Sequence, residues 1–401
     1  MKVLLVGSGG REHALAWALS RSASLTELHA APGNPGIAAL ASCHPVRADD
    51  PGSLVPLAAE LRVDLVVVGP EAPLVAGIAD ELRRRGVPVF GPGREAAQIE
   101  GSKAFAKDVM TAAGVPTART LPVARPPCVV KSDGLAAGKG VWVCRTQAEL
   151  DAGLRAAEGL GQPFHVEELL EGRELSVFAL CDGAGLLPLP AAQDYKRIGD
   201  GDVGPNTGGM GSYSPPTSVD SESAADRIVG DVCLPVLKEL ERRGTPFVGC
   251  LFAGLMLTED GPRVLEFNCR FGDPETQSLL PRLEGDLLEA LDACAQGDVH
   301  RVQLTAGSSA AVTVVLAGRG YPERSDSGTP IDGIADAEAT GALVFHAGTA
   351  LHDGRLVTNG GRILNVTALG DTLAEARAAA YDAAVRVDFA GVQFRRDIAH
   401  A

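Results

Sequence analysis

A glycine-rich stretch, KSDGLAAGKG at residues 131–140, has short valine-containing runs on both sides of it, CVV before and VWV after. Such β-branched runs predict strands, so the glycines join a strand to a strand. A Walker-type loop instead joins a strand to a helix, with four residues between its glycines and Ser or Thr after its Lys. Here three residues separate Gly134 from Gly138, and Gly140 follows Lys139. We therefore expect a flap that can cover a phosphate chain, although a hairpin without a ligand would have the same pattern.

The first hundred residues alternate between strand-like and helix-like patterns. Apolar runs at 3–6, 65–68 and 87–90 predict strands, and the stretches 12–19 and 74–85 have the spacing of helices. Alternation of this kind is typical of a parallel sheet covered by helices. The fold class expected for this part of the chain is therefore α/β, in a Rossmann-like domain.

The rest of the chain divides into two further parts. An amphipathic helix at 102–113 leads into a Gly-Val-Pro break, and antiparallel strands with one helix are expected over 117–182. Another αβ stretch follows, and the end of the chain has short strands and a helix of its own. We expect a multidomain α/β protein with domains at 1–101, 102–300 and 301–401, of which the last is small.

Charge and composition argue against several classes of partner. The 401 residues carry a net charge of −15, which disfavours nucleic acid because neutralising phosphates needs a basic face. No apolar run approaches the length of a membrane span, and the first residues lack the pattern of a signal peptide. The eight cysteines have no paired or metal-like spacing, which suits reduced thiols. We expect a cytoplasmic protein that acts on small molecules, without nucleic acid or membrane partners.

The first predicted strand ends in glycines that open a helix, which is where anions bind. A dinucleotide fingerprint would have Gly or Ala at the position of Glu12, and an acid at the end of the second strand. Both are missing, so NAD or FAD is disfavoured, and a phosphate beside Arg11 fits better. A second loop lies at the carboxyl end of a strand in the same sheet. The candidate residues of the two loops are Gly9, Gly10, Arg11, Glu12, Gly69, Pro70 and Glu71.

Glu266 and Asn268 are two positions apart in a predicted strand and so share one of its faces. A carboxylate and an amide oxygen are hard donors suited to a Mg²⁺ ion that bridges phosphates. Arg270 continues on the same side if the backbone stays extended, and would face whatever the metal binds. Taken alone, the pair could equally be a solvated strand end.

Lysine is rare in this chain, which has seven Lys and 29 Arg. A compact ammonium on a flexible stem is not interchangeable with a guanidinium, so lysines are expected where a point charge is needed. Four of the seven lie inside the candidate motifs, namely Lys103, Lys131, Lys139 and Lys196.

The chain contains, in order, GSGGREHALAW, GPEAPLV, EGSKAF, KSDGLAAGKGV, EELLEGRE, QDYKR, GPNTGGMGSYSP, LEFNCRFGDPETQ and TNGGRILNVTALG. Together these motifs resemble the glycinamide ribonucleotide synthetases, a family of the ATP-grasp superfamily, over nearly the whole chain. EFNCRFGDPETQ with GPNTGGMG is specific to that family, whereas KSDGLAAGKG is typical of the superfamily. The resemblance implies a pre-ATP-grasp domain, an ATP-grasp domain with a mobile lid over 117–182, and a small C-terminal domain.

The same resemblance implies that ATP lies between two antiparallel sheets, under the glycine flap, with Mg²⁺ or Mn²⁺ at its phosphates. The residues implied for ATP are Lys103, Lys131, Gly134, Gly138, Lys139, Gly140, Glu167, Glu168, Leu170 and Glu174. Those implied for the metal are Glu266 and Asn268. Those implied for the other substrates are Gly9, Gly10, Arg11, Glu12, Gly69, Pro70, Glu71, Asp194, Lys196, Arg197, Asn206, Thr207, Gly208, Gly209, Met210, Arg270 and Asp273.

The activity implied is the ATP-dependent joining of glycine to phosphoribosylamine through glycyl phosphate, a step of de novo purine biosynthesis, by a monomer. Catalysis would rest on positioning and on charge neutralisation by Lys131 and Arg270, since the route requires no protein nucleophile. The alternatives are another ATP-grasp carboxylate–amine ligase, a nucleotide-dependent oxidoreductase, which the failed fingerprint disfavours, and an ATP-binding protein without catalysis. The segments 116–131 and 150–166 are shorter than is usual for the family, which leaves the lid geometry open.

Overall fold

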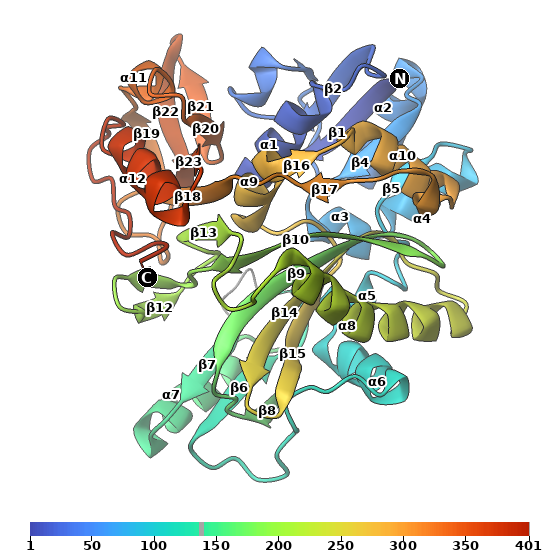
Figure 1. The fold of residues 1–401 in the computed structure, drawn as a ribbon, viewed down its shortest axis with the longest axis vertical. Helices are drawn as coiled ribbons and strands as arrows, with labels where there is room; N and C mark the ends of the chain where they lie inside the picture. The colour runs from blue at the N-terminus through green and yellow to red at the C-terminus, as the bar shows by residue number, and fades with distance from the viewer. Residues whose placement is uncertain (136–139, 401) are drawn as a thin grey trace.

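In the computed structural model, which describes residues 1–135 and 140–400, the N-terminal part is a parallel sheet in the order β3-β2-β1-β4-β5 (Figure 1). β1 is almost wholly buried and pairs with β2 on one side and with β4 on the other. The loops after β1 and β4 therefore emerge side by side at the carboxyl edge of the sheet. The elements are β1 (Lys2–Gly7), α1 (Gly10–Leu19), β2 (Glu27–Pro32), η1 (Ile37–Ala39), β3 (Ser42–Cys43), α2 (Pro51–Leu61), β4 (Leu65–Val68), α3 (Glu71–Val75), α4 (Ile78–Arg84) and β5 (Val89–Phe90).

The helix predicted over 74–85 is wrong in one respect, because the structure has two helices there, α3 and α4. Gly77 lies between them with a φ of +90°, a left-handed conformation that favours glycine and interrupts the helix. α2 was not predicted, although its start carries clear signals. Asp50 caps it by accepting a hydrogen bond from the Ser53 N–H, and Pro51 is its first residue.

The part of the chain predicted to be a lid contains a three-stranded antiparallel sheet in the order β7-β6-β8, with α7 packed on it. The glycine flap joins β6 to β7, so the predicted strand–loop–strand arrangement is confirmed. A small hydrophobic core of its own, which includes Val130, Leu150 and Val166, lies between the sheet and α7. The elements from residue 98 to residue 168 are α5 (Gln98–Gly101), α6 (Lys103–Ala113), β6 (Cys128–Ser132), β7 (Val141–Cys144), α7 (Gln147–Gly159) and β8 (Phe164–Glu168).

One eight-stranded sheet joins the middle of the chain to its end, in the order β15-β14-β9-β10-β13-β18-β23-β20. Its first strands are β9 (Arg173–Asp182), β10 (Leu186–Asp194), β13 (Gly211–Ser214), β14 (Val248–Thr258) and β15 (Gly261–Asn268). Its last strands are β18 (Ala310–Ala317), β20 (Leu343–His346) and β23 (Arg362–Gly370). The antiparallel pairing of β13 with β18 is the connection between the two parts. The C-terminal part is thus continuous with the sheet that carries Glu266 and Asn268.

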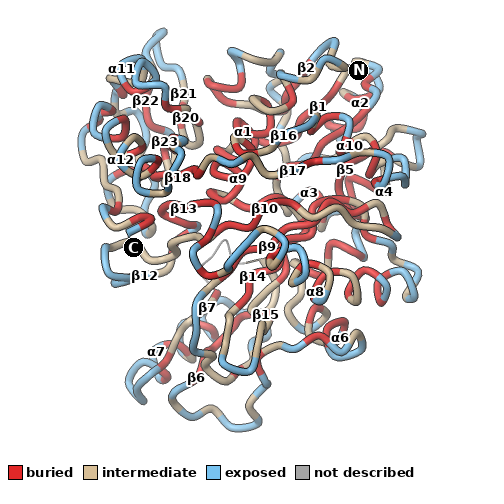
Figure 2. The backbone as a smooth tube through the Cα atoms, viewed as in Figure 1, coloured by how far each residue is buried: buried red, intermediate tan, exposed pale blue. Residues whose placement is uncertain are grey.

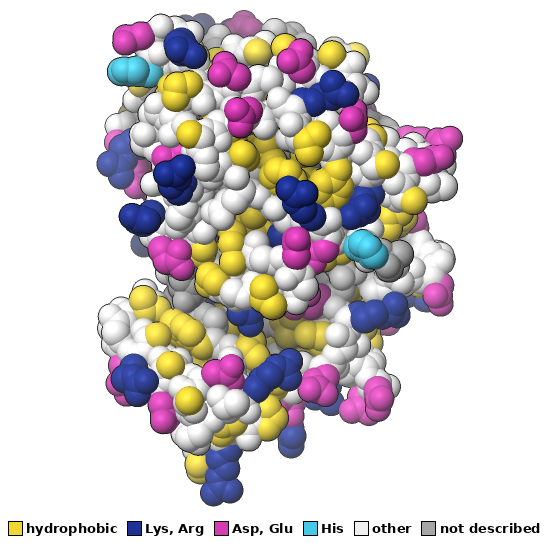
Figure 3. Space-filling view, turned by 90° about the vertical axis from the view of Figure 1, so that its left-hand side faces the viewer, with side chains coloured by type: hydrophobic (Ala, Val, Ile, Leu, Met, Phe, Trp, Pro, Cys, Tyr) yellow, Lys and Arg dark blue, Asp and Glu magenta, His cyan; other side chains and the backbone are white. Residues whose placement is uncertain are grey.

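The remaining elements include three small separate sheets and the helices of the middle and last parts of the chain. They are β11 (Arg197–Gly199), β12 (Val203–Asn206), α8 (Glu222–Arg242), α9 (Glu275–Leu279), η2 (Leu280–Arg282), β16 (Leu283–Glu284), α10 (Leu287–Gln296), η3 (Val299–Arg301), β17 (Thr305–Ala306), β19 (Asp326–Pro330), α11 (Ile334–Glu338), β21 (Thr349–His352), β22 (Arg355–Gly360) and α12 (Leu373–Ala384). Buried backbone runs through the centre of the molecule along β9, β10 and β14, as Figure 2 shows. In the space-filling view an indentation separates the lower part of the molecule, which holds the lid, from the body above it (Figure 3).

Candidate active site

The nucleotide end of the candidate site is built around the buried Glu167 carboxylate at the end of β8. It lies 2.8 Å from Nζ of Lys131, 2.9 Å from Nζ of Lys107 and 2.8 Å from Nε2 of His165. Burial raises the pKa of Glu167, but the His165 hydrogen bond and the two ammonium groups outweigh it and lower the pKa to about 2. Lys131 also donates a hydrogen bond to the Leu265 carbonyl, 2.9 Å away. The lid is thereby tied to both α6 and β15.

Two more residues expected at the adenosine are Glu168, the last residue of β8, and Leu170 in the turn that follows. The Glu168 carboxylate lies 2.6 Å from Arg119 and 3.3 Å from Arg263. Its side chain is therefore engaged by two guanidinium groups. Leu170 lies in the turn itself and is half-buried. A base bound beside this turn would meet backbone groups and an aliphatic side chain.

Asp133, which was not among the predicted site residues, fixes the first end of the glycine flap. Its Oδ1 accepts hydrogen bonds from the backbone N–H of Lys103 at 2.6 Å and from that of Gly134 at 3.1 Å. Nζ of Lys103 lies 3.4 Å from the Gly134 carbonyl. At the far end the Gly140 carbonyl accepts a hydrogen bond from β6 at 2.8 Å. Two predicted residues of the flap lie outside the described residues, Gly138 and Lys139.

Glu266 and Asn268 share one face of β15, as their spacing predicts, and Glu266 is opposite Gly254 of β14. Within the described part of the chain, neither side chain has a hydrogen-bond or ion-pair partner, and Asn268 is buried. Burial raises the pKa of Glu266, but nearby cations outweigh it, so the net shift is downward. The cations are Lys196, Lys131, Lys103 and Arg270. An ionised carboxylate and a free amide oxygen side by side are a donor set that fits a hard divalent cation.

Arg270 is held between two carboxylates from earlier in the chain. Its Nε lies 3.2 Å from Glu71 and its terminal nitrogen 2.8 Å from Glu100. Glu71 begins α3, with Pro70 before it, and also lies 4.0 Å from Arg11. Burial raises the pKa of Glu71, but the two guanidinium groups outweigh it and lower the pKa to about 2. The loop after β4 and the strand end after β15 are therefore joined by ion pairs.

At the start of α1, Glu12 occupies the place between the two N-terminal loops. One of its oxygens accepts a hydrogen bond from the Gly9 N–H and the other from Nε of Arg11, both at 2.6 Å. A Cβ at Gly69 would lie 2.2 Å from a Glu12 oxygen, so the second loop closely approaches the same carboxylate. Arg11 is buried and also donates to the Phe271 carbonyl at 3.1 Å. A phosphate at this helix start would have to replace Glu12 as the acceptor.

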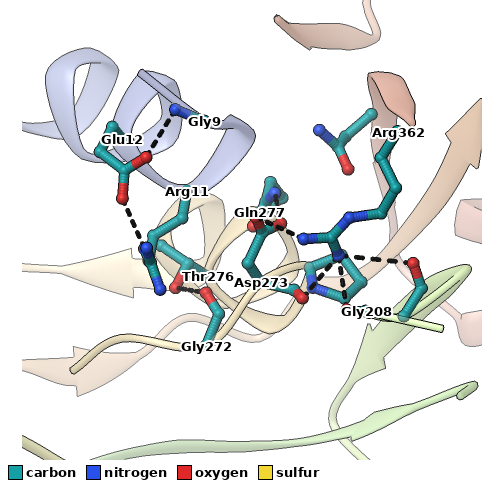
Figure 4. A network of polar contacts seen from close by, with 12 residues as sticks. Gly9, Arg11, Glu12, Gly208, Gly272, Asp273, Thr276, Gln277 and Arg362 are labelled. Carbon is teal, nitrogen blue, oxygen red and sulfur yellow. Dashed lines mark hydrogen bonds and ion pairs between the residues drawn. The ribbon is translucent and has the colours of Figure 1, made fainter. Parts of the chain in front are cut away.

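Asp273 connects the three parts of the chain (Figure 4). One of its oxygens accepts a hydrogen bond from Gln277 at 2.7 Å, and the other lies 2.8 Å from a terminal nitrogen of Arg362. Arg362 comes from β23 and also donates to the Gly208 carbonyl at 2.6 Å. Gly9 approaches from the other side, since a Cβ there would lie 3.8 Å from Asp273. Gly10 begins α1 and packs against the same region.

The loop that follows β12 is held mostly by hydrogen bonds to other parts of the chain. The Thr207 hydroxyl donates to the Lys196 carbonyl at 2.8 Å and accepts from the Gly209 N–H at 3.0 Å. Met210 is fully buried. The Asn206 amide lies 3.5 Å from a carbonyl of the lid strand β7. The loop therefore lies between the lid and the last part of the chain.

Lys196 lies 3.1 Å from Glu174, so the strand end of β10 meets the start of β9. Burial raises the pKa of Asp194 to about 6, against the opposing charge of Lys196. Burial also raises the pKa of Glu275 to about 8, and the Asp194 carboxylate adds to that shift. Arg197 instead donates to the Gly204 carbonyl, 2.7 Å away in its own hairpin. Two carboxyls that hold protons readily thus lie near the predicted substrate lysine.

The structure brings the predicted residues into two groups. One lies around the flap, β8 and β15, and the other lies where the N-terminal loops meet Arg270 and Asp273. Several residues that make these connections were not predicted. Five of them are Glu100, Lys107, Asp133, Glu275 and Arg362. All but Lys107 lie inside the motifs quoted above. The sequence therefore indicated that these charged residues belong to the site, but not which residues they contact. None of the described helices is long and apolar enough to cross a membrane.

Comparison with known proteins gives the same picture for the whole chain. The model for the phosphoribosylglycinamide synthetase N domain matches residues 1–100, that for its ATP-grasp (A) domain residues 101–276, and that for its C domain residues 311–401. A phosphoribosylamine–glycine ligase of Mesorhizobium japonicum is 49% identical, over 99% of this chain and 97% of the relative. One from Streptomyces coelicolor is 50% identical, over 100% of this chain and 99% of the relative.

Solved structures agree with these relatives. The crystal structure of a phosphoribosylamine–glycine ligase from Thermotoga maritima matches with a TM-score of 0.83 at 34% identity, covering 99% of this chain and 100% of that one. The biotin carboxylase domain of a Hydrogenobacter thermophilus 2-oxoglutarate carboxylase, solved with MgADP, shares the fold with a TM-score of 0.72 at 16% identity, covering 98% and 91% of the two chains. The resemblance in the motifs and the multidomain α/β fold are thereby confirmed. The chain belongs to the phosphoribosylglycinamide synthetase family and is an ATP-grasp ligase.

Proposed function

We propose that this chain joins glycine to phosphoribosylamine, with conversion of ATP to ADP and phosphate, as a step of de novo purine biosynthesis. The observation that carries the proposal is the Glu266–Asn268 pair. Its oxygens have no partner among the described residues and lie among the lysines that the motifs assign to phosphates. The names of the relatives, which match over the full chain, supply the identity of the two substrates.

ATP is assigned to the space between the lid and β15. Lys131 and Lys103 would reach its phosphates from β6 and from the start of α6, under the flap that begins at Gly134. The turn that follows Glu168 and holds Leu170 would meet the adenine with backbone groups. Lys131 would exchange its present partners, Glu167 and the Leu265 carbonyl, for phosphate oxygens. Glu167 would keep Lys107 and His165, so it need not become an unpaired buried charge.

A divalent cation fits at Glu266 and Asn268, for which we propose Mg²⁺ or Mn²⁺. When bound there it would neutralise phosphate charge and orient the phosphates for in-line attack. The chain supplies the rest of the charge neutralisation through Lys131 and Arg270. No nucleophilic side chain is required, because the attacking groups belong to the substrates.

The reaction is proposed to run in two steps. A carboxylate oxygen of glycine attacks the γ-phosphorus of ATP, the bond to ADP breaks, and glycyl phosphate forms. The amine of phosphoribosylamine then attacks the acyl carbon, loses a proton, and phosphate leaves with the former carboxylate oxygen. Closure of the lid would keep water from the acyl phosphate.

The amine substrate is assigned to the junction of the N-terminal loops, Asp273 and the 206–210 loop. Glycine is assigned to the neighbourhood of Arg270, Asp194 and Lys196, where a guanidinium would meet its carboxylate. The buried carboxyls there suit the amino groups of both substrates. The domain limits proposed with this assignment are 1–101, 102–300 with a lid over 117–182, and 301–401.

Incubation of the purified chain with ATP, glycine and phosphoribosylamine generated in situ tests the proposal. We expect equal amounts of ADP, phosphate and glycinamide ribonucleotide. Replacing glycine by other amino acids and phosphoribosylamine by other amines tests the alternative, another carboxylate–amine ligase of the same superfamily. Turnover that prefers a different acid or amine would favour that alternative. We further propose a monomer that acts in the cytoplasm on these small molecules, without nucleic acid, which the net charge of −15 disfavours.

A further inference from the structure

Arg362 is the first residue of β23, and its guanidinium donates hydrogen bonds to two loops from the middle of the chain. One terminal nitrogen donates to the Gly208 carbonyl at 2.6 Å, to the Asp273 carbonyl at 2.7 Å and to the Gly209 carbonyl at 3.4 Å. The other lies 2.8 Å from the Asp273 carboxylate. Its side chain is 19% exposed, so these contacts are partly shielded from water. Four acceptors on one rigid fork fix both loops relative to each other.

The glycine at position 208 is explained by this guanidinium. A Cβ added there would lie 3.2 Å from Cζ and 3.3 Å from a terminal nitrogen of Arg362. Gly208 does not have a left-handed backbone, whereas Gly209 has a φ of +108°. Glycine is therefore favoured at position 209 because of its left-handed backbone, and at position 208 because a side chain would meet the flat face of the Arg362 guanidinium.

The last part of the chain holds Gly208 at a second point. The Tyr321 hydroxyl accepts a hydrogen bond from the Gly208 N–H at 2.9 Å. A Cβ at Gly361 would lie 2.4 Å from the Tyr321 ring, so this glycine makes room for the ring. The GGR of the TNGGRILN motif thus places one tyrosine and one arginine on the same turn of the 206–210 loop.

Asp273 receives its orientation from the same contacts. With one oxygen on Gln277 and the other on Arg362, the carboxylate cannot rotate without losing a hydrogen bond. Its Arg362-bound oxygen faces Gly9, where the N-terminal loop approaches (Figure 4). The carboxylate and the 206–210 loop are the groups assigned above to phosphoribosylamine.

We propose that Arg362 is a positioning residue for the phosphoribosylamine subsite. It sets Asp273 and the Gly208–Gly209 turn in the geometry that receives the ribosyl part of this substrate, while its own donors stay on the protein. The last part of the chain thereby completes a subsite to which it contributes no reacting group. This inference rests on the proposed function, because it takes the amine substrate to bind at Asp273.

Steady-state kinetics of Arg362→Gln, Arg362→Lys and Gly208→Ala test the proposal, with Arg355→Gln, at the exposed first residue of β22, as the matched control. We expect each of the three to raise the KM for phosphoribosylamine about tenfold to a hundredfold, with the KM for ATP nearly unchanged. Lys should not restore binding, because one ammonium cannot reach all four acceptors. The control should behave like the parent.

The sharpest readout is a double-mutant cycle between positions 208 and 362. Gly208→Ala should be harmful in the parent and nearly neutral in Arg362→Gln, because the added methyl group would no longer meet a guanidinium. Additive effects, or an equal rise in the KM values for ATP and phosphoribosylamine, would overturn the positioning role. Should Arg362→Gln fail to fold, Arg362→Lys takes its place in the cycle, because one ammonium cannot reach all four acceptors. A parent protein that forms no glycinamide ribonucleotide would overturn the proposed function instead.

Discussion

The carboxylate of Glu71, at the edge of the N-terminal sheet, lies 3.2 Å from Nε of Arg270, which follows β15. Glu100 meets the other side of the same guanidinium at 2.8 Å. A guanidinium can serve two carboxylates at once because its donors are spread over a rigid fork. The position of Arg270 in the candidate site is therefore set by two segments that precede the lid.

Arg270→Lys keeps the charge but cannot keep both carboxylates. We expect kcat to fall about tenfold to a hundredfold, since a displaced cation would no longer neutralise the reacting groups. The KM for ATP should change little. Steady-state assays with each substrate varied in turn measure this, and Arg242→Lys on the exposed face of α8 is the control. A kcat equal to that of the parent would contradict the role assigned to Arg270.

Stability in acid should depend on Glu71. Its pKa of about 2 lies below the ordinary value of 4.5, so its contribution is present above about pH 4.5 and is lost as the pH falls toward 2. For a side chain that is 28% exposed, we expect this contribution to amount to about 1–2 kcal/mol at pH 3. Thermal unfolding of the parent and of Glu71→Gln at pH 6 and pH 3 measures the difference. The variant should lose less stability between the two pH values, and equal losses would contradict the assignment.

Replacing both proposed metal donors should separate activity from stability. Glu266→Gln with Asn268→Ala removes two oxygens that have no partner among the described residues, so the fold should lose little. We expect no detectable ligation at saturating Mg²⁺, while the variant still unfolds in one cooperative transition like the parent. Activity that survives in the double variant would show that the metal is held elsewhere.

The first glycine of the flap offers a matched pair of substitutions. Gly134 and Gly161 have φ values of +87° and +65°, and neither has an atom closer than 3.5 Å to an added Cβ. Alanine should cost each site a similar free energy, about 1 kcal/mol. Only Gly134→Ala should weaken ATP binding and lower kcat, because only that residue begins the flap. Isothermal titration calorimetry with an ATP analogue measures the affinity of each variant. Equal affinities in both variants would contradict the role of the 134–140 loop as a flap over ATP.

The parts of the fold that could be predicted are those that depend on short-range patterns. The strand–loop–strand flap follows from β-branched runs around glycines, and the shared face of Glu266 and Asn268 follows from the two-residue period of a strand. The break at Gly77 and the cap at Asp50 are local features too, because each depends on residues next to it in the sequence.

The contacts that arrange the candidate site could not be predicted in this way. Arg362 and Asp273 are 89 positions apart, and Arg270 and Glu100 are 170 apart. Nothing in the sequence near either partner specifies the other, because such pairs arise from how the sheets are joined. The antiparallel pairing of β13 with β18, which continues the central sheet into the last part of the chain, is a non-local event of the same kind.

Transfer of an isotope label tests the central claim most directly. Glycine labelled with ¹⁸O in its carboxylate, incubated with ATP, phosphoribosylamine and the chain, should pass one labelled oxygen to each phosphate released, because that oxygen attacks the γ-phosphorus and leaves with it. Mass spectrometry of the phosphate and of the nucleotide product measures the label. Labelled phosphate formed in step with glycinamide ribonucleotide and ADP is the predicted result. Unlabelled phosphate, or release of AMP and pyrophosphate, would contradict the glycyl phosphate route.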